Sequence, residues 1–323
     1  MIYFTLFLLS FILTYVIKNI ALKKSMFDIP NERSSHSVPI PHGGGIALAL
    51  TWFIGLIYLY MHDLIQKDLF LALFFGIIIS FVSFLDDIYK LSPKIRLFVQ
   101  FFVSGCALYI SGGLSKIDFG FYAIDNQIFT NIFAIFMMVW FINLYNFLDG
   151  IDGYAGSEAI FLGLAGYLLF SNAVFLVLIA AVGGFLLWNW QKAKIFMGDV
   201  GSTLLGYNVA VFTLFYQNNG TSFLVWMILF SLFWFDATLT LYRRYKNGEK
   251  LSLAHKKHAY QRLNQSGWSH QKVVMYSILL NLILLIFAFF AKKYQNLSLI
   301  MLLMAIIMLC AVMKNIDKRK KFI

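Results

Sequence analysis

A run of amide and carboxylate side chains follows directly on an apolar segment near the middle of the chain. The run contains Asn143, Asn146, Asp149 and Asp152, and the apolar segment covers residues 132–142. A carboxylate in hydrocarbon costs a few kcal/mol or more, so such groups are usually paired, face a wet cavity or hold an ion. Residues three apart fan over one half of an α-helix, so these four side chains can converge on one cation. The pattern predicts a polar site at the end of a membrane span.

The composition indicates a membrane protein. Hydrophobic residues make up 60% of the chain, charged residues make up 13%, and the mean hydropathy is +0.76. Soluble globular proteins have about a quarter of their residues charged. We therefore predict an all-α integral membrane protein that forms one domain over residues 1–323. We expect about eleven spans of sufficient length, centred roughly on Leu9, Trp52, Ile77, Val103, Met138, Leu164, Val182, Val209, Phe230, Leu282 and Met304.

Basic residues are distributed unevenly over the loops that eleven spans create. Of the 26 lysines and arginines, only Lys67, Lys116, Lys292 and Lys293 fall on the side of the N-terminus. Cytoplasmic loops are enriched in Lys and Arg, so we expect the N-terminus outside and the C-terminus in the cytoplasm. The net charge of +11 reflects first this asymmetry and second an attraction for anionic lipids or phosphorylated substrates. Nucleic-acid binding is not expected, because the sequence indicates no soluble basic domain.

Two polar segments lie in the first two predicted cytoplasmic loops. Residues 28–45 combine three prolines with a glycine run that includes Gly44, and a helix that begins there can offer free N–H groups to a phosphate. Asp86 and Asp87 end the third apolar run. Adjacent carboxylates on a helix point about 100° apart, so one can meet a cation while the other accepts a proton. A solvated loop and a polar helix end are the respective alternatives.

Two more polar segments lie further along the same predicted face. Asp199 lies between two glycines just before an apolar run, where a pyrophosphate could approach and the carboxylate could bind Mg²⁺ or Mn²⁺. A simple helix cap is the alternative. His255 and His258 share a helix face, but cations surround them and no cysteine joins them, which favours phosphate contact over a zinc site. A plain basic loop is the alternative there. On the opposite side, a small hairpin is expected around Gly120.

Together these segments resemble the polyprenyl-phosphate N-acetylaminosugar-1-phosphate transferase family, glycosyltransferase family 4, over nearly the whole chain. The matched blocks occur in the expected order: the first loop, Asp86–Asp87, Asn143–Gly153, Phe196–Ser202 and the spacing of the two histidines. This family transfers a sugar phosphate from a UDP-sugar to a membrane polyprenyl phosphate and releases UMP. The resemblance implies an enzyme whose active face is formed by cytoplasmic loops near residues 23–45, 86–96, 146–156, 191–202 and 243–272.

The resemblance also implies roles for the matched positions. Asn146 and Asp199 look like the family's ligands of a catalytic Mg²⁺, for which Mn²⁺ can substitute. The catalytic positions implied are Asp86, Asp87, Asp149, Asp152, His255 and His258. The substrate-binding positions implied are Asn31, Arg33, Gly44, Lys94, Arg96, Asn143, Arg243 and Arg244. A divalent ion and cationic side chains suit this reaction, because the UDP-sugar and the lipid phosphate together bring about three to four negative charges.

The late loop distinguishes two branches of the family. The murein-precursor branch carries three consecutive histidines there, whereas this chain has His255-Lys256-Lys257-His258. The chain therefore resembles the branch that starts O-antigen or related surface glycans in the bacterial inner membrane. The expected partners are undecaprenyl phosphate and a UDP-N-acetylaminosugar, such as UDP-GlcNAc or a 6-deoxy relative (UDP-FucNAc or UDP-QuiNAc). A phospho-MurNAc-pentapeptide transferase is the alternative function, and a homodimer is left open.

Two other classes of membrane protein are less consistent with the sequence. A secondary transporter gathers polar residues near the bilayer midplane and contains an inverted repeat, whereas here these residues gather at one predicted face. A CDP-alcohol phosphotransferase would need an Ala-Arg pair soon after its Asp-Gly motif. This chain has Tyr154-Ala155-Gly156 at that place.

Overall fold

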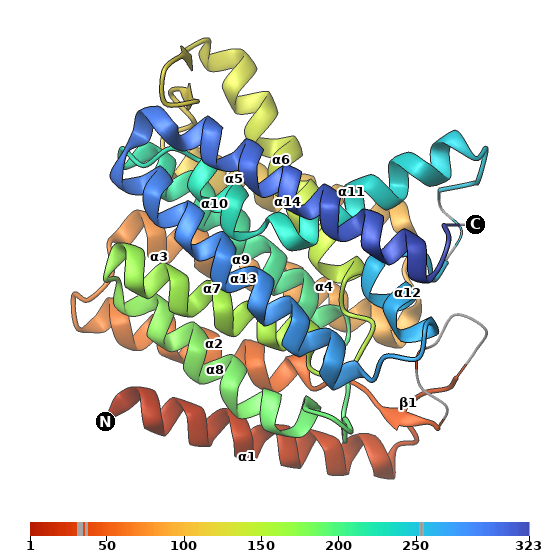
Figure 1. The fold of residues 1–323 in the computed structure, drawn as a ribbon. Coiled ribbons are helices and arrows are strands. Elements are labelled where there is room, and N and C mark those ends of the chain that lie inside the picture. The colour runs from red at the N-terminus through yellow and green to blue at the C-terminus, as the bar shows by residue number, and fades with distance from the viewer. Residues whose placement is uncertain (31–34, 36–37, 252, 254, 323) are drawn as a thin grey trace.

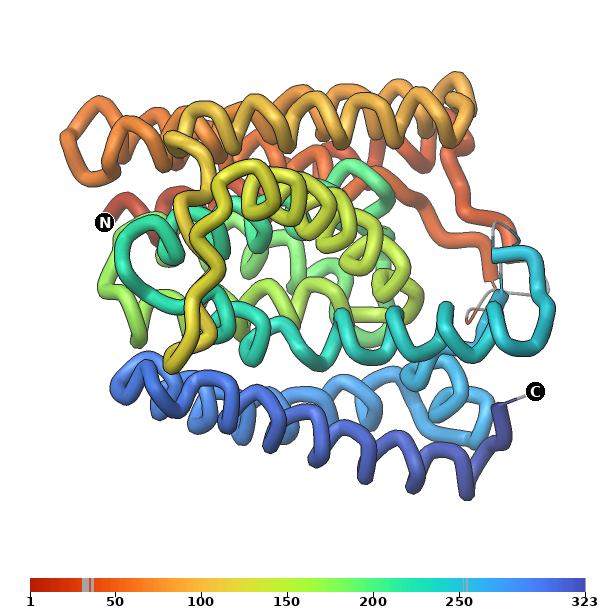
Figure 2. Tube along the Cα trace, turned by 90° about the horizontal axis from the view of Figure 1, so that it is seen from above, coloured from red at the N-terminus to blue at the C-terminus, as the bar shows by residue number. Residues whose placement is uncertain are grey.

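Helices build almost all of the structure, a computed structural model that describes residues 1–30, 35, 38–251, 253 and 255–322 (Figure 1). Most of them lie roughly side by side, and Figure 2 shows α4 and α5 in one outer layer and α13 and α14 in the opposite one. The described residues form α1 (Ile2–Lys23), α2 (Gly45–Met61), α3 (Lys67–Phe74), α4 (Gly76–Tyr89), α5 (Pro93–Ile110), α6 (Gln127–Phe147), α7 (Tyr154–Phe170), α8 (Ala173–Asn189), α9 (Asp199–Asn218), α10 (Leu224–Leu229), α11 (Ser231–Lys246), α12 (Ala259–Gln265), α13 (His270–Lys293) and α14 (Ser298–Arg319).

Short strands complete the secondary structure of the described ranges. β1 (Phe27–Asp28) pairs antiparallel with β2 (Ile40–Pro41). β3 (Ile117–Asp118) pairs antiparallel with β4 (Ala123–Ile124), and Gly120 adopts a φ of 95° in the turn between them. The hairpin expected around Gly120 is therefore confirmed.

Among the described residues, six helical segments are long and apolar enough to cross a membrane: Ile2–Lys23, Lys67–Tyr89, Pro93–Ile110, Gln127–Phe147, His270–Lys293 and Gln295–Arg319. Three shorter apolar helices, α2, α7 and α8, pack among them. These segments confirm an all-helical, multi-pass membrane protein. Ten of the eleven predicted centres lie inside α-helices, while Phe230 lies at the junction of α10 and α11. The number of eleven spans and the orientation stay predictions.

Helix α9 lies at the centre of the bundle, and its packing determines where Asp199 lies. Every residue from Val200 to Gln217 is buried, and α9 packs against α2, α4 and α6. The outer helices instead expose large apolar side chains, such as Phe4 on α1 and Ile307 on α14, as expected for surfaces that face lipid. Because α9 is held on all sides, its first residue, Asp199, has a fixed position at one end of the bundle.

A close backbone approach fixes the start of α9 against the start of α2. The N–H groups of Gly44 and Gly45 donate to the carbonyls of Phe196 and Met197 at 2.9 and 2.8 Å. A Cβ at Gly45 would lie only 2.4 Å from the backbone nitrogen of Gly201. The glycines of the first loop therefore allow the segment before Asp199 to pack directly against the segment before α2.

Candidate active site

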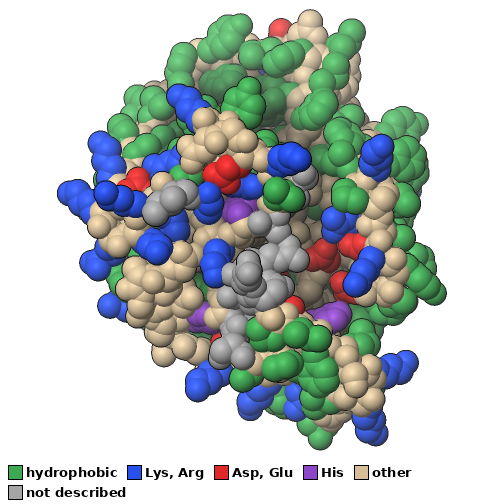
Figure 3. All heavy atoms as spheres, turned by 90° about the vertical axis from the view of Figure 1, so that its right-hand side faces the viewer, with side chains coloured by type: hydrophobic (Ala, Val, Ile, Leu, Met, Phe, Trp, Pro, Cys, Tyr) green, Lys and Arg blue, Asp and Glu red, His purple; other side chains and the backbone are tan. Residues whose placement is uncertain are grey.

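A cavity of about 710 Å³ opens at the end of the bundle where α4, α6 and α11 end and α9 begins. Figure 3 views this end, where acidic and histidine side chains appear among many lysines and arginines. The cavity is lined by polar side chains that include Asp28, His42, Asp87, Arg96, Asn146, Asp149, Asn189, Asp199, Arg244, His255, His258, Tyr260 and Gln261.

One polar cluster joins four helices beside this cavity, and its members Arg96, Asn146 and Asp199 line it. The Nδ2 of Asn146 donates to Oδ1 of Asp199 at 2.9 Å. The Nη1 of Arg96 lies 2.9 Å from Oδ2 of Asp86 and 3.3 Å from Oδ2 of Asp199. Side chains from α4, α5, α6 and α9 therefore meet at one point, although they come from distant parts of the sequence.

The donor set of this cluster suits a hard cation. The guanidinium of Arg96 bridges Asp86 and Asp199, so two carboxylates already share one positive group. Carboxylate and amide oxygens are the ligands that Mg²⁺ prefers, and the Asn146 amide presents its oxygen to a cation when it is turned over. Within the described ranges, no group of three or more His, Cys, Asp or Glu side chains is arranged as a complete metal site. The protein ligands available are thus few, as is usual for Mg²⁺ held together with substrate phosphates.

Asp149 lies on the same cavity wall, just beyond α6. Burial away from bulk water and, to a lesser extent, the negative charge of Asp199 raise the pKa of Asp149 to about 7. A carboxyl group with this pKa exchanges its proton near neutral pH, and a cation or a cationic substrate group nearby would favour the charged form. Asp87 also lines this cavity, with its Oδ2 3.7 Å from the position that a Cβ on Gly198 would occupy.

Asp152 occupies a different place from its neighbours in the motif. Its Oδ2 accepts the backbone N–H of Ala193 at 3.1 Å and lies 3.3 Å from Nδ1 of His270. Gly153 follows in a left-handed conformation, with a φ of 73°, which turns the chain into α7. Asp152 is not among the described residues that line the cavity. Its side chain instead joins the loop after α6 to the loop before α9.

The substrate-binding positions expected before α7 also lie in different places in the structure. Asn143 donates to Oε1 of Gln100 at 2.7 Å and lines a side cavity of about 220 Å³ next to the Asp199 cluster. Lys94 is exposed in the first turn of α5. Gly44 uses its N–H on Phe196 and packs against Phe185 rather than on the cavity wall. The remaining two positions, Asn31 and Arg33, lie outside the described residues.

The two arginines at the end of α11 point to different partners. Arg243 forms a bidentate pair with Asp317 of α14 at 2.9 and 3.0 Å. Arg244 is 2% exposed; its Nε donates to Glu249 at 3.0 Å and its Nη2 to the Lys250 carbonyl at 2.8 Å. Arg244 also lines the main cavity. Among the described residues, Arg244 therefore lines the main cavity and Arg243 does not.

Both histidines of the late loop reach the cavity. Their ring centroids are 4.8 Å apart, and His258 precedes the first turn of α12 as its N-cap. Burial, followed by electrostatic interactions with His258 and Arg244, lowers the pKa of His255 to about 4. His255 is therefore neutral at neutral pH and can serve as a hydrogen-bonding group without a charge.

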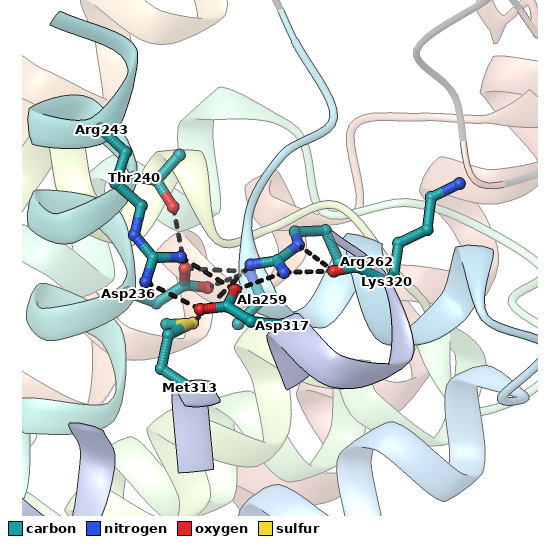
Figure 4. A network of polar contacts seen from close by, with 8 residues as sticks. All are labelled: Asp236, Thr240, Arg243, Ala259, Arg262, Met313, Asp317 and Lys320. Carbon is teal, nitrogen blue, oxygen red and sulfur yellow. Dashed lines mark hydrogen bonds and ion pairs between the residues drawn. The ribbon is translucent and has the colours of Figure 1, made fainter. Parts of the chain in front are cut away.

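A network of carboxylates that lie outside the expected set holds this loop (Figure 4). Both oxygens of Asp236 accept the backbone N–H of Ala259 at 2.9 Å, and Oδ1 also accepts the hydroxyl of Thr240 at 3.1 Å. Asp317 binds Arg262 of α12 as well as Arg243. Asp236 does carry a sequence signal, because a lone carboxylate inside an apolar run is usually functional or paired.

These features define a multi-pass helical membrane protein with an acidic cluster and a basic loop around one cavity. Residues 69–217 match the family model described as glycosyl transferase family 4. The chain is 30% identical over 303 residues to a Bacillus subtilis protein named probable undecaprenyl-phosphate N-acetylglucosaminyl 1-phosphate transferase, and the alignment covers 87% of this chain and 82% of that protein. The chain belongs to the polyprenyl-phosphate N-acetylaminosugar-1-phosphate transferase family, which confirms the resemblance seen in its sequence.

Two further relatives carry different names. A Thermotoga maritima protein named undecaprenyl-phosphate alpha-N-acetylglucosaminyl 1-phosphate transferase is 33% identical over 205 residues, which is 62% of this chain and 60% of that protein. A Streptococcus pneumoniae phospho-N-acetylmuramoyl-pentapeptide-transferase is 30% identical over 204 residues, which is 58% of this chain and 62% of that protein. Both are similar to this chain within the class of polyprenyl-phosphate sugar-phosphate transferases.

Proposed function

We propose that this protein transfers an N-acetylaminosugar 1-phosphate from a UDP-sugar to undecaprenyl phosphate at the cytoplasmic face of a bacterial inner membrane. The observation that carries the proposal is the meeting of Asp86 with Arg96, Asn146 and Asp199, the last three of which line a cavity that the late basic loop also bounds. Such an arrangement offers carboxylates for a cation and cationic groups for phosphates. The cytoplasmic placement is supported by the unequal distribution of Lys and Arg.

Asp199 and Asn146 would hold Mg²⁺, with Asp86 and Asp87 beside them. When bound, this ion neutralises phosphate charge and polarises the phosphorus–oxygen bonds of the diphosphate. Arg96, which contacts both Asp86 and Asp199, would then be freed to contact an anionic substrate oxygen. Arg244 and the two histidines approach the cavity from the opposite side, where they would bind the diphosphate of the donor.

The reaction that fits these positions is a displacement at phosphorus. An oxygen of the lipid phosphate attacks the β-phosphorus of the UDP-sugar, the bond from this phosphorus to the bridging oxygen breaks, and UMP leaves with that oxygen. The product is a polyprenyl diphosphate sugar. Asp86 or Asp87 would accept the last proton of the lipid phosphate, since both end α4 beside Asp199. A carboxylate is a suitable base for a phosphate monoanion because their pKa values differ by only a few units.

The sugar is proposed to be GlcNAc or a 6-deoxy relative such as FucNAc or QuiNAc, in a pathway that starts a surface glycan such as O-antigen. The names of the Bacillus and Thermotoga relatives support GlcNAc. The absence of a triple histidine between residues 255 and 258 supports the same branch. A phospho-MurNAc-pentapeptide transferase is the second candidate, because the Streptococcus relative carries that name.

A donor competition assay tests the proposal. Purified protein with undecaprenyl phosphate would be given UDP-GlcNAc, UDP-FucNAc or UDP-MurNAc-pentapeptide, each labelled in the sugar. We expect label in the lipid fraction with release of UMP for at least one of the first two donors. Turnover of the pentapeptide donor alone would establish the second candidate. Release of UDP instead of UMP would contradict sugar-phosphate transfer altogether.

A further inference from the structure

A second cavity, of about 510 Å³, lies beside the main one, on the outer side of the late loop. Its wall is formed by the end of α11, the loop that follows it, α12 and the C-terminal residues Lys320–Phe322. The two cavities share Arg244, Leu253 and His255 as a common wall. Figure 1 shows the C-terminus next to α12, at the same end of the bundle as the main cavity.

The second cavity carries a large excess of positive charge. Five lysines line it: Lys250, Lys256, Lys257, Lys320 and Lys321. The carboxylate among its described lining residues is Glu249, which already binds Arg244 at 3.0 Å and Lys257 at 2.8 Å. In the described part of the chain the other four lysines form no ion pair. Like charges held around one cavity repel each other and raise the local concentration of anions.

Hydrogen bonds, an ion pair and ring contacts hold the positively charged wall of this cavity in place. Arg262 is 3% exposed, donates from Nε to the carbonyl of Lys320 at 3.2 Å and binds Asp317 (Figure 4). The ring of Phe322 lies over Arg262 and Lys257, with centroid distances of 5.5 and 5.7 Å. These contacts hold the C-terminal segment in place, so its lysines are presented toward the cavity.

The cavity also lies where helix α14 leaves the apolar layer. The candidate span Gln295–Arg319 ends one residue before Lys320. On α11 the side chains of Tyr242 and Tyr245 are 52% and 71% exposed, and exposed tyrosines are enriched at the boundary between a bilayer and water. Basic pockets at this level are suited to the phosphates of anionic lipid headgroups.

We propose that this cavity is a second anion site, which binds the phosphate of an anionic phospholipid headgroup. A free inorganic phosphate shares this chemistry, but the position of Lys320 at the end of a span favours a ligand within the headgroup layer. A lipid bound there would neutralise the lysines and stabilise the loop that carries His255. The proposal does not depend on the transferase activity, because the lysines that carry it line only the second cavity and have no part in the proposed reaction, although the two cavities share Arg244 and His255.

The test measures lipid binding to the purified full-length chain in detergent, by titration followed with native mass spectrometry. The pocket variant combines Lys256→Gln, Lys320→Gln and Lys321→Gln. The matched control combines Lys246→Gln, Lys314→Gln and Lys318→Gln, which removes the same charge from exposed positions on α11 and α14 outside the cavity. Phosphatidylglycerol should bind wild type and control alike. It should bind the pocket variant on the order of a hundredfold more weakly, since each lysine contributes roughly a factor of five.

Three further arms separate the outcomes. The variant with Lys→Arg at the same three pocket positions should keep the affinity, which shows that a loss with Gln does not arise from misfolding. Phosphatidylcholine should bind all variants equally weakly. Inorganic phosphate that binds through the same lysines, without phosphatidylglycerol binding, would overturn the lipid assignment in favour of a free phosphate. Equal losses in the pocket and control variants would overturn the site itself, because diffuse surface charge would then explain the binding.

Discussion

The carboxylate of Asp236 lies 3.7 Å from Nδ1 of His258, and the two residues are 4% and 3% exposed. Asp236 also accepts the N–H of Ala259, the first residue of α12, on both oxygens. A helix N-terminus carries partial positive charge, which a carboxylate stabilises. One buried carboxylate on α11 therefore fixes the start of α12 and lies next to the histidine that faces the main cavity.

The first prediction is that Asp236→Asn lowers kcat by about ten- to hundredfold while the protein still folds, because a charged hydrogen-bond acceptor is lost. An amide can accept the Ala259 N–H with only one oxygen and places no negative charge beside His258. Steady-state assays over a range of pH would measure kcat and its pH profile. Thr240→Val is the control, since it removes a neutral partner of Asp236 and should have little effect. An unchanged profile in Asp236→Asn would show that this carboxylate has only a structural role.

The second prediction concerns Asp199. Asp199→Asn keeps the size of the side chain but removes a charge from the cluster with Arg96 and Asn146, so turnover should fall about a hundredfold or more. EDTA should abolish wild-type activity, and Mg²⁺ or Mn²⁺ should restore it. Asp118→Asn is the control, because Asp118 binds the N–H of Gly120 in the distant hairpin and should leave turnover unchanged. A chelator-resistant enzyme would contradict the assignment of a divalent ion.

The third prediction concerns pH and stability. The pKa of His255 is lowered from 6.5 to about 4, chiefly by burial. The unfolded chain therefore binds this proton below 6.5, whereas the folded protein binds it only near 4, so stability falls as the pH decreases through this interval. Thermal unfolding in detergent should show a smaller loss between about pH 7 and about pH 5 for His255→Gln than for wild type. His62→Gln, at an exposed histidine after α2, should retain the wild-type slope; the same slope in His255→Gln would refute the prediction.

The fourth prediction concerns the contact of α2 with α9. A Cβ on Gly45 would lie 2.4 and 2.7 Å from the backbone nitrogen and Cα of Gly201. Backbone atoms cannot rotate away, so Gly45→Ala should destabilise the protein by about 1–3 kcal/mol and displace Asp199. Gly105→Ala in α5 is the matched control, because its Cβ would meet nothing within 4 Å and alanine favours a helix by up to about 1 kcal/mol. Melting temperatures and turnover of both variants would test this; equal stability in the two would exclude a tight contact.

Some features of the site could be predicted from the sequence because they depend on where apolar runs begin and end. Asn146 ends one apolar run and Asp199 precedes another, and the structure places both at helix ends that line the main cavity. Their pairing, with a 2.9 Å contact, is implied by the resemblance to the family and not by their spacing. The helix face predicted for the two histidines is wrong, because His255 lies in the loop before α12 and His258 is the N-cap of that helix. Both nevertheless line the cavity. Where a helix end decides the position of a side chain, the sequence is sufficient.

Other features depend on tertiary contacts that spacing does not reveal. Adjacent residues on a helix point about 100° apart, so Arg243 and Arg244 point in different directions. Arg243 binds Asp317, which is distant in the sequence, whereas Arg244 lines the cavity. Asp152 is spaced three residues from Asp149, yet α6 already ends at Phe147, and contacts with Ala193 and His270 hold the Asp152 carboxylate elsewhere. The break at Phe230 between α10 and α11 likewise interrupts a hydropathic run that looks continuous.

The last prediction tests the orientation of the bundle. Lys90 and Lys116 are exposed on either side of α5, a candidate span of 18 residues. With the N-terminus outside, a cysteine at Lys116 should react with an impermeant thiol reagent in intact cells, whereas one at Lys90 should react only after permeabilisation. The background would carry Cys106→Ala and Cys310→Ala, which removes both native thiols. Labelling of Lys90→Cys in intact cells, with protection of Lys116→Cys, would place the cavity outside, away from cytoplasmic UDP-sugars, and would contradict the proposed function.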